Sequence, residues 1–214
     1  MGMMRNILLM AMGVFMVSGC SVFGASGVEE APYQVLKRDG AIEVRHYESM
    51  VLAVTPMEAG SNGRDGSFGR LFQYITGANV AAQDIPMTAP VFMADKDEAA
   101  SESAQISMTA PVFMGGEGTM MSFVLPAEYT METAPKPTNA QVWLQEVQDY
   151  KVAAIRFSGL LNEKNTSKHE VKLRAWIEGQ PYDAAGDAVT AGYNPPFTIP
   201  AMRRNEVLIP VRGE

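Results

Sequence analysis

The sequence contains one cysteine, Cys20, and two histidines, His46 and His169. A lone cysteine forms no internal disulfide and no Cys-ligated metal cluster, and its early position leaves the body of the chain without a cysteine nucleophile. Two histidines leave little room for a His-rich metal site. Basic residues are also scarce, since 17 Lys and Arg face 24 Asp and Glu. The resulting net charge of -7 repels phosphate backbones and disfavours nucleic-acid binding.

The apolar run near the N-terminus, Ile7–Val17, is too short to cross a membrane. As a helix it would rise about 16 Å, against about 30 Å of hydrocarbon in a bilayer. The basic residue Arg5 precedes it and small residues follow it, as in a secretory signal. We therefore expect residues 1–19 to be a signal peptide.

The end of this segment, Val17-Ser18-Gly19-Cys20, resembles the lipobox of bacterial lipoproteins. The resemblance implies that Cys20 becomes the acylated first residue of a membrane-tethered chain. Ser21 after the cysteine resembles the outer-membrane sorting pattern, which implies the periplasmic side of that membrane. An ordinary secretory signal with an incidental cysteine is the alternative. Residues 20–32 are small, polar and acidic, and we expect them to be a flexible linker.

Residues 33–214 have the composition of one globular domain, and their patterns predict strands and two helices. A three-strand meander is expected over Tyr33–Leu36, Ile42–Tyr47 and Met50–Met57, with a turn at Asp39-Gly40. Later expected strands are Val142–Val147 and Tyr150–Phe157, joined as a hairpin through Gln148-Asp149, and Asn205–Val211.

Apolar residues at i, i+3, i+4 and i+7 predict an amphipathic helix over residues 67–76. Asp65 or Ser67 is placed to cap its start, and Gly77 to end it. Ser167-x-x-Glu170 is a capping box, which predicts that a second helix begins there and runs to Glu178.

The order of hairpin, strand, loop, helix and further strands occurs twice, at an offset near 100 residues. This order indicates a pseudo-twofold α+β domain in which both halves contribute strands to one curved sheet or barrel. Met87-Thr-Ala-Pro-Val-Phe-Met93 also recurs identically as residues 108–114. Pro90 and Pro111 restrict each copy to an edge strand or a strand entry. The Met residues are either adaptable packing or, together with Phe92 and Phe113, the rim of a ligand cleft.

Six motifs in family order resemble the SOUL heme-binding protein family: Glu43-Val-Arg45, Phe68-x-x-Leu71-x-x-Tyr74, Met87-Thr-Ala-Pro-Val91, Phe157-Ser-Gly159, Tyr193-Asn-x-Pro196 and Arg203-Arg-Asn-Glu-Val207. The resemblance covers residues 33–211. It implies a distorted antiparallel β-barrel of two pseudo-symmetric halves, each with a flanking α-helix. It also implies affinity for heme or another tetrapyrrole, without a demonstrated general enzymatic reaction. The duplicated Met-Thr-Ala-Pro-Val arm and its acidic connector depart from the single-motif pattern of the animal members of this family.

By this resemblance, the first helix borders the porphyrin groove. Phe68 and Phe72 then lie on the groove side, Arg70 lies near a propionate, and Leu71 and Ile75 belong to the core. The alternative, that all four apolar residues only pack the helix onto the sheet, stays open.

Either histidine could ligate the heme iron, but His46 also fits a solvent-facing position and His169 a capping or rim role. The iron ligand therefore stays unknown at this point. Arg203 and Arg204 could pair with propionates, or bond to Glu206 or to a carbonyl.

No nucleophile elbow, phosphate loop or metal pattern is present in the sequence, and we expect no enzymatic activity. The sequence therefore favours a membrane-tethered heme binder. The alternatives are a binding module for other amphipathic small molecules and an enzyme acting on a tetrapyrrole or envelope substrate.

Overall fold

The computed structural model describes residues 29–58, 61, 64–80, 85, 87–89, 91–94, 119–194 and 197–213. This part of the chain contains ten strands, two α-helices and one short 3-10 helix. In chain order these are β1 (Glu29–Glu30), β2 (Gln34–Asp39), β3 (Ile42–Met57), α1 (Ser67–Ile75), β4 (Thr88–Ala89), β5 (Val91–Ala94), β6 (Thr119–Val124), β7 (Trp143–Phe157), α2 (Glu163–Glu178), β8 (Tyr182–Ala184), β9 (Val189–Gly192), η1 (Pro200–Met202) and β10 (Asn205–Gly213).

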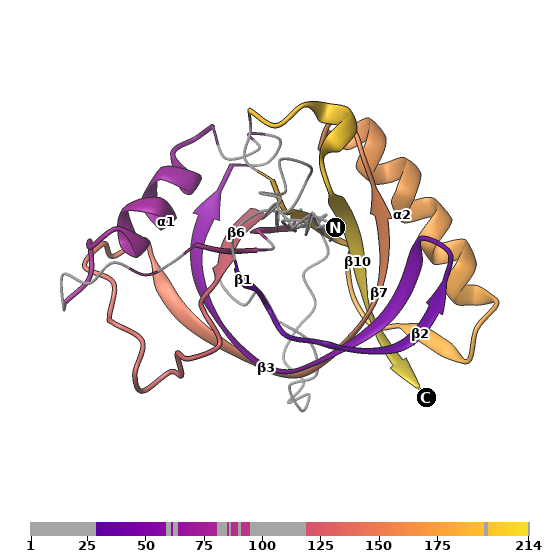
Figure 1. The fold of residues 1–214 in the computed structure, drawn as a ribbon, viewed down its shortest axis with the longest axis horizontal. Helices are drawn as coiled ribbons and strands as arrows, with labels where there is room; N and C mark the ends of the chain where they lie inside the picture. Colours follow the sequence, from indigo (N-terminus) through magenta and orange to yellow (C-terminus); the bar gives the residue numbers. More distant parts are fainter. Residues whose placement is uncertain are drawn as a thin grey trace, which may run out of the picture.

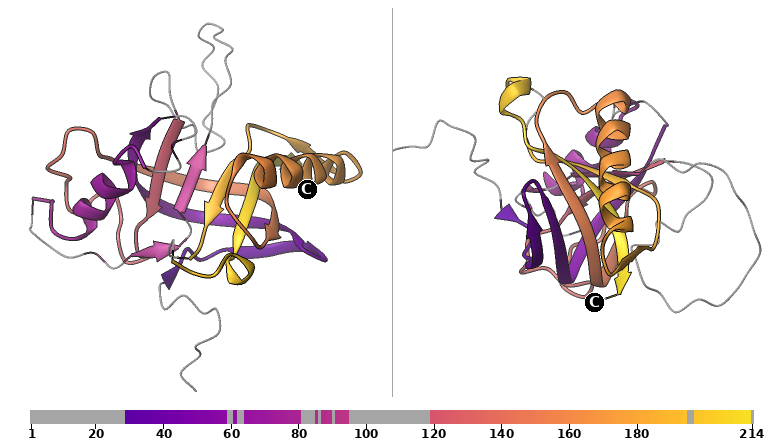
Figure 2. Two further views of the ribbon diagram at one scale, coloured as in Figure 1. Left: turned by 90° about the horizontal axis from the view of Figure 1, so that it is seen from above. Right: turned by 90° about the vertical axis from the view of Figure 1, so that its right-hand side faces the viewer.

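Six of the described strands close into an antiparallel barrel in the order β3, β6, β5, β9, β10, β7, and pairing of β7 with β3 completes the ring. β2 extends the sheet beside β3, β8 pairs with β10, and β1 pairs in parallel with β4. Figure 1 and Figure 2 show α1 and α2 at opposite ends of the molecule, flanking the curved strands. The predicted α+β fold with a distorted barrel and two flanking helices is confirmed.

The barrel has the predicted pseudo-twofold arrangement. Half of the ring is β3, β6 and β5, and the other half is β7, β10 and β9 in the corresponding order. The long strands β3 and β7 are each followed by the helix of their own half. An offset of about 100 residues carries β3 almost onto β7, which agrees with the repeat seen in the sequence.

Two of the predicted strand boundaries are wrong. Residues 42–57 form one strand instead of two, and the predicted hairpin at Gln148-Asp149 does not form. Asp149 has a positive φ of 49°, yet β7 pairs with β3 in the same register on both sides of it. The turn-like residues therefore mark a local irregularity inside a long strand, because pairing with β3 keeps the chain extended.

Three apolar cores arise because strand side chains point alternately to the two faces of the sheet. The barrel interior includes Tyr47 and Leu208. The core beneath α1 includes Leu71 and Phe123, and the core beneath α2 includes Leu173. Each helix therefore covers the outside of one half of the barrel, and its other face is left for solvent or a ligand.

Helix α1 begins and ends within one residue of its prediction. Gly66 is its N-cap residue, and the Asp65 carboxylate accepts a hydrogen bond of 3.1 Å from the Ser67 N–H. Helix α2 begins earlier than predicted, at Glu163, where the Asn162 side chain accepts a hydrogen bond from the Asn165 N–H. The predicted capping box lies inside this helix and does not start it, because Asn162 supplies the cap one turn earlier.

Candidate functional site

Helix α1 presents two aromatic rings to the surface. Phe68 and Phe72 are 38% and 44% exposed, and their rings are stacked with centroids 6.1 Å apart and an angle of 13° between planes. Phe68 also contacts Phe123 edge to face at 5.3 Å. Leu71 and Ile75 are buried, as predicted. We call Phe68 and Phe72 the aromatic face of α1.

Arg70 lies on the same helix and is held against the end of β3. Its Nε donates a hydrogen bond of 2.9 Å to the Thr55 hydroxyl, and a terminal nitrogen donates to the Pro56 carbonyl. Since a guanidinium carries five N–H donors, these bonds fix its position and leave further donor capacity. Arg70 is thus a positioned cation on the helix that carries the aromatic face.

His46 lies away from α1, in an open depression of about 410 Å³ between β2 and β3, lined by Pro32, Tyr33, Gln34, His46, Glu48 and Ser49. Its Nε2 lies 2.7 Å from the Asp149 carboxylate. His169 stacks on Phe157 with ring centroids 4.2 Å apart, and its Nδ1 lies 2.7 Å from the Asn165 carbonyl oxygen. The two histidines and the aromatic face therefore lie on different elements.

Phe92 does not lie on an exposed rim. It is 3% exposed and belongs to the interior core, so the prediction that this arm presents Phe92 at the edge of a cleft is wrong. Side chains alternate along β5, so Val91 and Met93 pack beneath α1 while Phe92 points into the barrel interior. Phe113 of the second arm lies outside the described residues.

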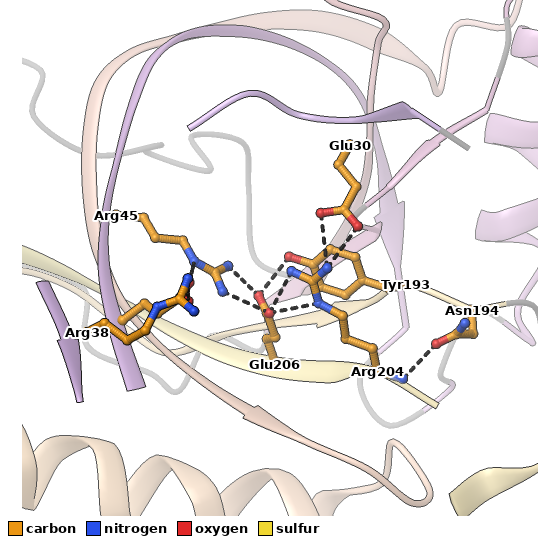
Figure 3. A network of polar contacts seen from close by, with 8 residues as sticks. Glu30, Arg38, Arg45, Tyr193, Asn194, Arg204 and Glu206 are labelled. Carbon is orange, nitrogen blue, oxygen red and sulfur yellow. Dashed lines mark hydrogen bonds and ion pairs between the residues drawn. The ribbon is translucent and has the colours of Figure 1, made fainter. Parts of the chain in front are cut away.

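A buried ion-pair network spans the barrel interior (Figure 3). Arg45 of β3 donates hydrogen bonds of 2.6 and 3.0 Å to the two carboxylate oxygens of Glu206 on β10. Arg45 is 3% exposed and Glu206 is fully buried. Arg45 also donates a hydrogen bond of 2.7 Å to Glu43, and Glu43 forms an ion pair with Arg38 at the surface.

Arg204 joins this network from the other side. Its Nε donates a hydrogen bond of 3.0 Å to Glu206. A terminal nitrogen donates hydrogen bonds of 2.8 and 3.0 Å to the two carboxylate oxygens of Glu30 on β1 (Figure 3). Its guanidinium lies 3.7 Å from the centroid of the Tyr193 ring. The Tyr193 hydroxyl donates a hydrogen bond of 2.7 Å to Glu206. Glu206 therefore accepts hydrogen bonds from two arginines and one tyrosine.

These contacts decide the charge states inside the barrel. Burial alone would raise the pKa of Glu206, but hydrogen bonds and positive charge from Arg45, followed by Arg204, lower it below the usual range. Burial and the neighbouring Glu206 charge raise the pKa of Tyr193 well above its usual value. At neutral pH the interior therefore holds a carboxylate between two guanidinium groups, beside a neutral phenol.

The sequence pointed to only part of this network. The bond between Arg204 and Glu206 is one of the two alternatives left open for that arginine, whereas the roles of Arg45 and Glu30 were missed. The alternation of β3 could have indicated the position of Arg45. Arg45 and Tyr47 are two residues apart and so point to the same face of the strand, and Tyr47 is in the interior core. Arg203, by contrast, donates a hydrogen bond to the Thr198 carbonyl.

The described residues were compared with the requirements of a metal site and of a membrane-spanning helix. No three His, Cys, Asp or Glu side chains come together there in a way that could hold a metal ion. No helix in this part of the chain has the length and apolar character needed to cross a membrane.

The chain is similar to Heme-binding protein 2 of Homo sapiens. The two sequences are 25% identical over 191 residues, which cover 86% of this chain and 85% of the human protein.

Solved structures of EcmrR share the fold. EcmrR in a complex with DNA matches 85% of this chain with a TM-score of 0.55 and 11% identity, and this chain spans 58% of that longer protein. The C-terminal domain of EcmrR alone matches 85% of this chain and is itself 99% covered, with a TM-score of 0.53 and 12% identity. At these identities the likeness concerns the fold only.

A profile of the SOUL heme-binding protein family matches residues 28–210, which include the barrel, both helices and the ion-pair network. The match covers most of the chain and agrees with the six motifs found in the sequence. The chain therefore belongs to the SOUL heme-binding protein family.

Proposed function

We propose that this protein binds heme or a related tetrapyrrole on the aromatic face of α1. The observation that carries the proposal is the stacked, half-exposed pair of Phe68 and Phe72 in a chain of the SOUL family. A porphyrin is a flat apolar disc, and two rings within 13° of parallel offer it an apolar surface. Covering such side chains contributes about 1.5 to 3 kcal/mol each when burial is complete.

The helix that carries this face also carries a cation that could pair with a porphyrin propionate. Arg70 is fixed on the same helix and retains N–H donors for a propionate, while its bonds to Thr55 and Pro56 limit its motion. Neither histidine lies on α1. We therefore propose that apolar contact and propionate pairing supply most of the affinity, and that an axial histidine is not needed.

We further propose that binding takes place at a membrane surface. The lipobox-like end at Cys20 supports a lipid anchor on the periplasmic side of the outer membrane, and residues 20–32 would link it to the barrel. Two or three acyl chains hold a protein firmly, whereas one holds it only marginally. A tethered binder in this position would buffer heme or pass it on.

A hemin titration of the full chain in nonionic detergent tests the binding proposal. Saturable one-to-one binding at the Soret band is expected, and Phe72→Ala should weaken it more than about tenfold, which corresponds to about 1.4 kcal/mol. Phe197→Ala is the matched control, because Phe197 is 86% exposed and lies before η1. Equal affinities of the wild type and Phe72→Ala would move the site away from α1.

The same titration separates the other two functions. Absence of hemin binding, together with binding of lipids or dyes, would indicate a module for other amphipathic molecules. Chemical turnover of bound pigment would indicate an enzyme.

A further inference from the structure

The short segment Glu29–Ala31 packs against the interior core of the barrel. Ala31 is 3% exposed and belongs to the interior core. Its N–H donates a hydrogen bond of 3.1 Å to the Ala89 carbonyl oxygen. β1 itself pairs with β4 over only two residues. Figure 3 shows Glu30 reaching from this segment to Arg204. The attachment of the segment to the barrel therefore depends on few backbone contacts.

The side chain of Glu30 adds a contact between this segment and Arg204. Both Glu30 carboxylate oxygens accept from one terminal nitrogen of Arg204, while another terminal nitrogen lies 2.9 Å from a carboxylate oxygen of Glu206. The side chain of Glu30 is 40% exposed, whereas that of Glu206 is fully buried. Of the two carboxylates on Arg204, Glu30 is thus the one that an incoming group can replace.

The charges of the network require a carboxylate at this position. Its three cations and three carboxylates balance: Arg38, Arg45 and Arg204 against Glu30, Glu43 and Glu206. Without Glu30 the network carries one excess positive charge, and the terminal nitrogen of Arg204 that donates to Glu30 loses its carboxylate partner while the bonds of Arg204 to Glu206 remain. Release of β1 is therefore favoured when another carboxylate takes the place of Glu30.

A separate observation indicates unused hydrogen-bonding capacity at the same interior. The Ser122 hydroxyl is buried and has no hydrogen-bond partner in the described part of the chain. Ser122 pairs across the sheet with Val54 and Phe92 of the interior core. Buried hydroxyls normally find a partner, so the Ser122 hydroxyl can donate to a ligand oxygen.

We propose that Arg204 carries a carboxylate-binding subsite in which Glu30 is an internal occupant that a ligand carboxylate replaces. The Tyr193 ring, stacked on the Arg204 guanidinium, gives the subsite an apolar wall, so the ligand is a carboxylate on an apolar body. A porphyrin propionate and a fatty acid share this chemistry. The subsite is separate from the aromatic face of α1 and does not depend on the proposed function.

The test measures the affinity of three probes for the full chain, at one fixed concentration of nonionic detergent. The probes are protoporphyrin IX, its dimethyl ester, which lacks both carboxylates, and dodecanoate. Glu30→Gln removes the negative charge of the internal occupant while preserving side-chain size. It should tighten binding of at least one carboxylate probe about two- to fivefold, the range expected from loss of an exposed ion pair, and leave the ester unchanged.

Glu29→Gln is the matched control. It removes the same charge from the neighbouring residue. The Glu29 carboxylate accepts a hydrogen bond of 3.0 Å from the Ala127 N–H, whereas the Glu30 carboxylate accepts from Arg204. Equal tightening by both variants, no tightening by Glu30→Gln, or no carboxylate binding to Glu30→Gln would each overturn the subsite.

The probes also separate this inference from the proposed function. If both porphyrins bind equally and Glu30→Gln changes neither, tetrapyrrole binding stands without the subsite. If only dodecanoate binds, and binds more tightly to Glu30→Gln, the subsite stands without tetrapyrrole binding.

Discussion

Arg45 and Glu206 are 161 positions apart in the chain and form two hydrogen bonds of 2.6 and 3.0 Å in the barrel interior. Their strands, β3 and β10, are not neighbours, because β7 lies between them in the ring. The pair therefore links two strands that share no backbone hydrogen bonds.

The first prediction concerns the stability that depends on this pair. Glu206→Gln leaves Arg45 and Arg204 facing a neutral amide in the interior, and we expect a loss of about 3 to 5 kcal/mol in the free energy of unfolding. Urea denaturation at pH 7 measures it. The control is Arg174→Met, which breaks a half-exposed pair with Glu170 on α2 and should cost less than about 0.5 kcal/mol. Similar losses for both variants would contradict a special role of the buried network.

The second prediction is the pH dependence of the same group. The folded-state pKa of Glu206 lies below its usual value of 4.5, so Glu206 contributes stability above pH 4.5 and loses it as the pH falls toward the folded-state pKa. Wild type should therefore lose stability more steeply than Glu206→Gln between about pH 4.5 and pH 2. Thermal unfolding followed across that range measures both slopes, and parallel curves would argue against the assignment.

Local patterns predicted the elements that depend on neighbours in the chain. The spacing of Leu71 and Ile75 fixes the buried side of α1 because a helix repeats every 3.6 residues. The repeat near 100 residues predicted the relation of β3 and β7 because each half has the same order of elements.

Long-range pairing decided what the sequence could not show. Gln148-Asp149 resembles a turn, but pairing with β3 on both sides keeps β7 continuous. The partner of Arg45 lies on a distant strand, and no local pattern selects Glu206 over other carboxylates. The role of Glu30 depends on where β1 crosses the barrel, which is again a tertiary feature.

The third prediction concerns the two histidines. His46 is paired with Asp149 and His169 stacks on Phe157, so neither is on the aromatic face of α1. His46→Ala and His169→Ala should each weaken hemin binding less than tenfold, under about 1.4 kcal/mol. Hemin titration at the Soret band measures this. Loss of the Soret shift in either variant would show that axial ligation dominates.

The fourth prediction concerns localisation and involves Cys20, which lies outside the described residues. Cys20→Ala removes the acceptor of the acyl chains, so the variant should leave the membrane fraction and incorporate no labelled fatty acid. Cell fractionation and metabolic labelling measure the two effects, with Ser21→Ala as the control that keeps the cysteine. Membrane partition and labelling equal to wild type would exclude acylation at this cysteine.

The last prediction separates the two sides of α1. Leu71 is fully buried beneath the helix, so Leu71→Ala should lower the free energy of unfolding by about 2 to 5 kcal/mol through lost burial and a cavity. Phe72 is 44% exposed, so Phe72→Ala should cost clearly less stability than Leu71→Ala while weakening hemin binding more than about tenfold. Urea denaturation and hemin titration of the same preparations give both quantities. If Phe72→Ala lost stability as severely as Leu71→Ala and kept its hemin affinity, the aromatic face would be structural and the site would lie elsewhere.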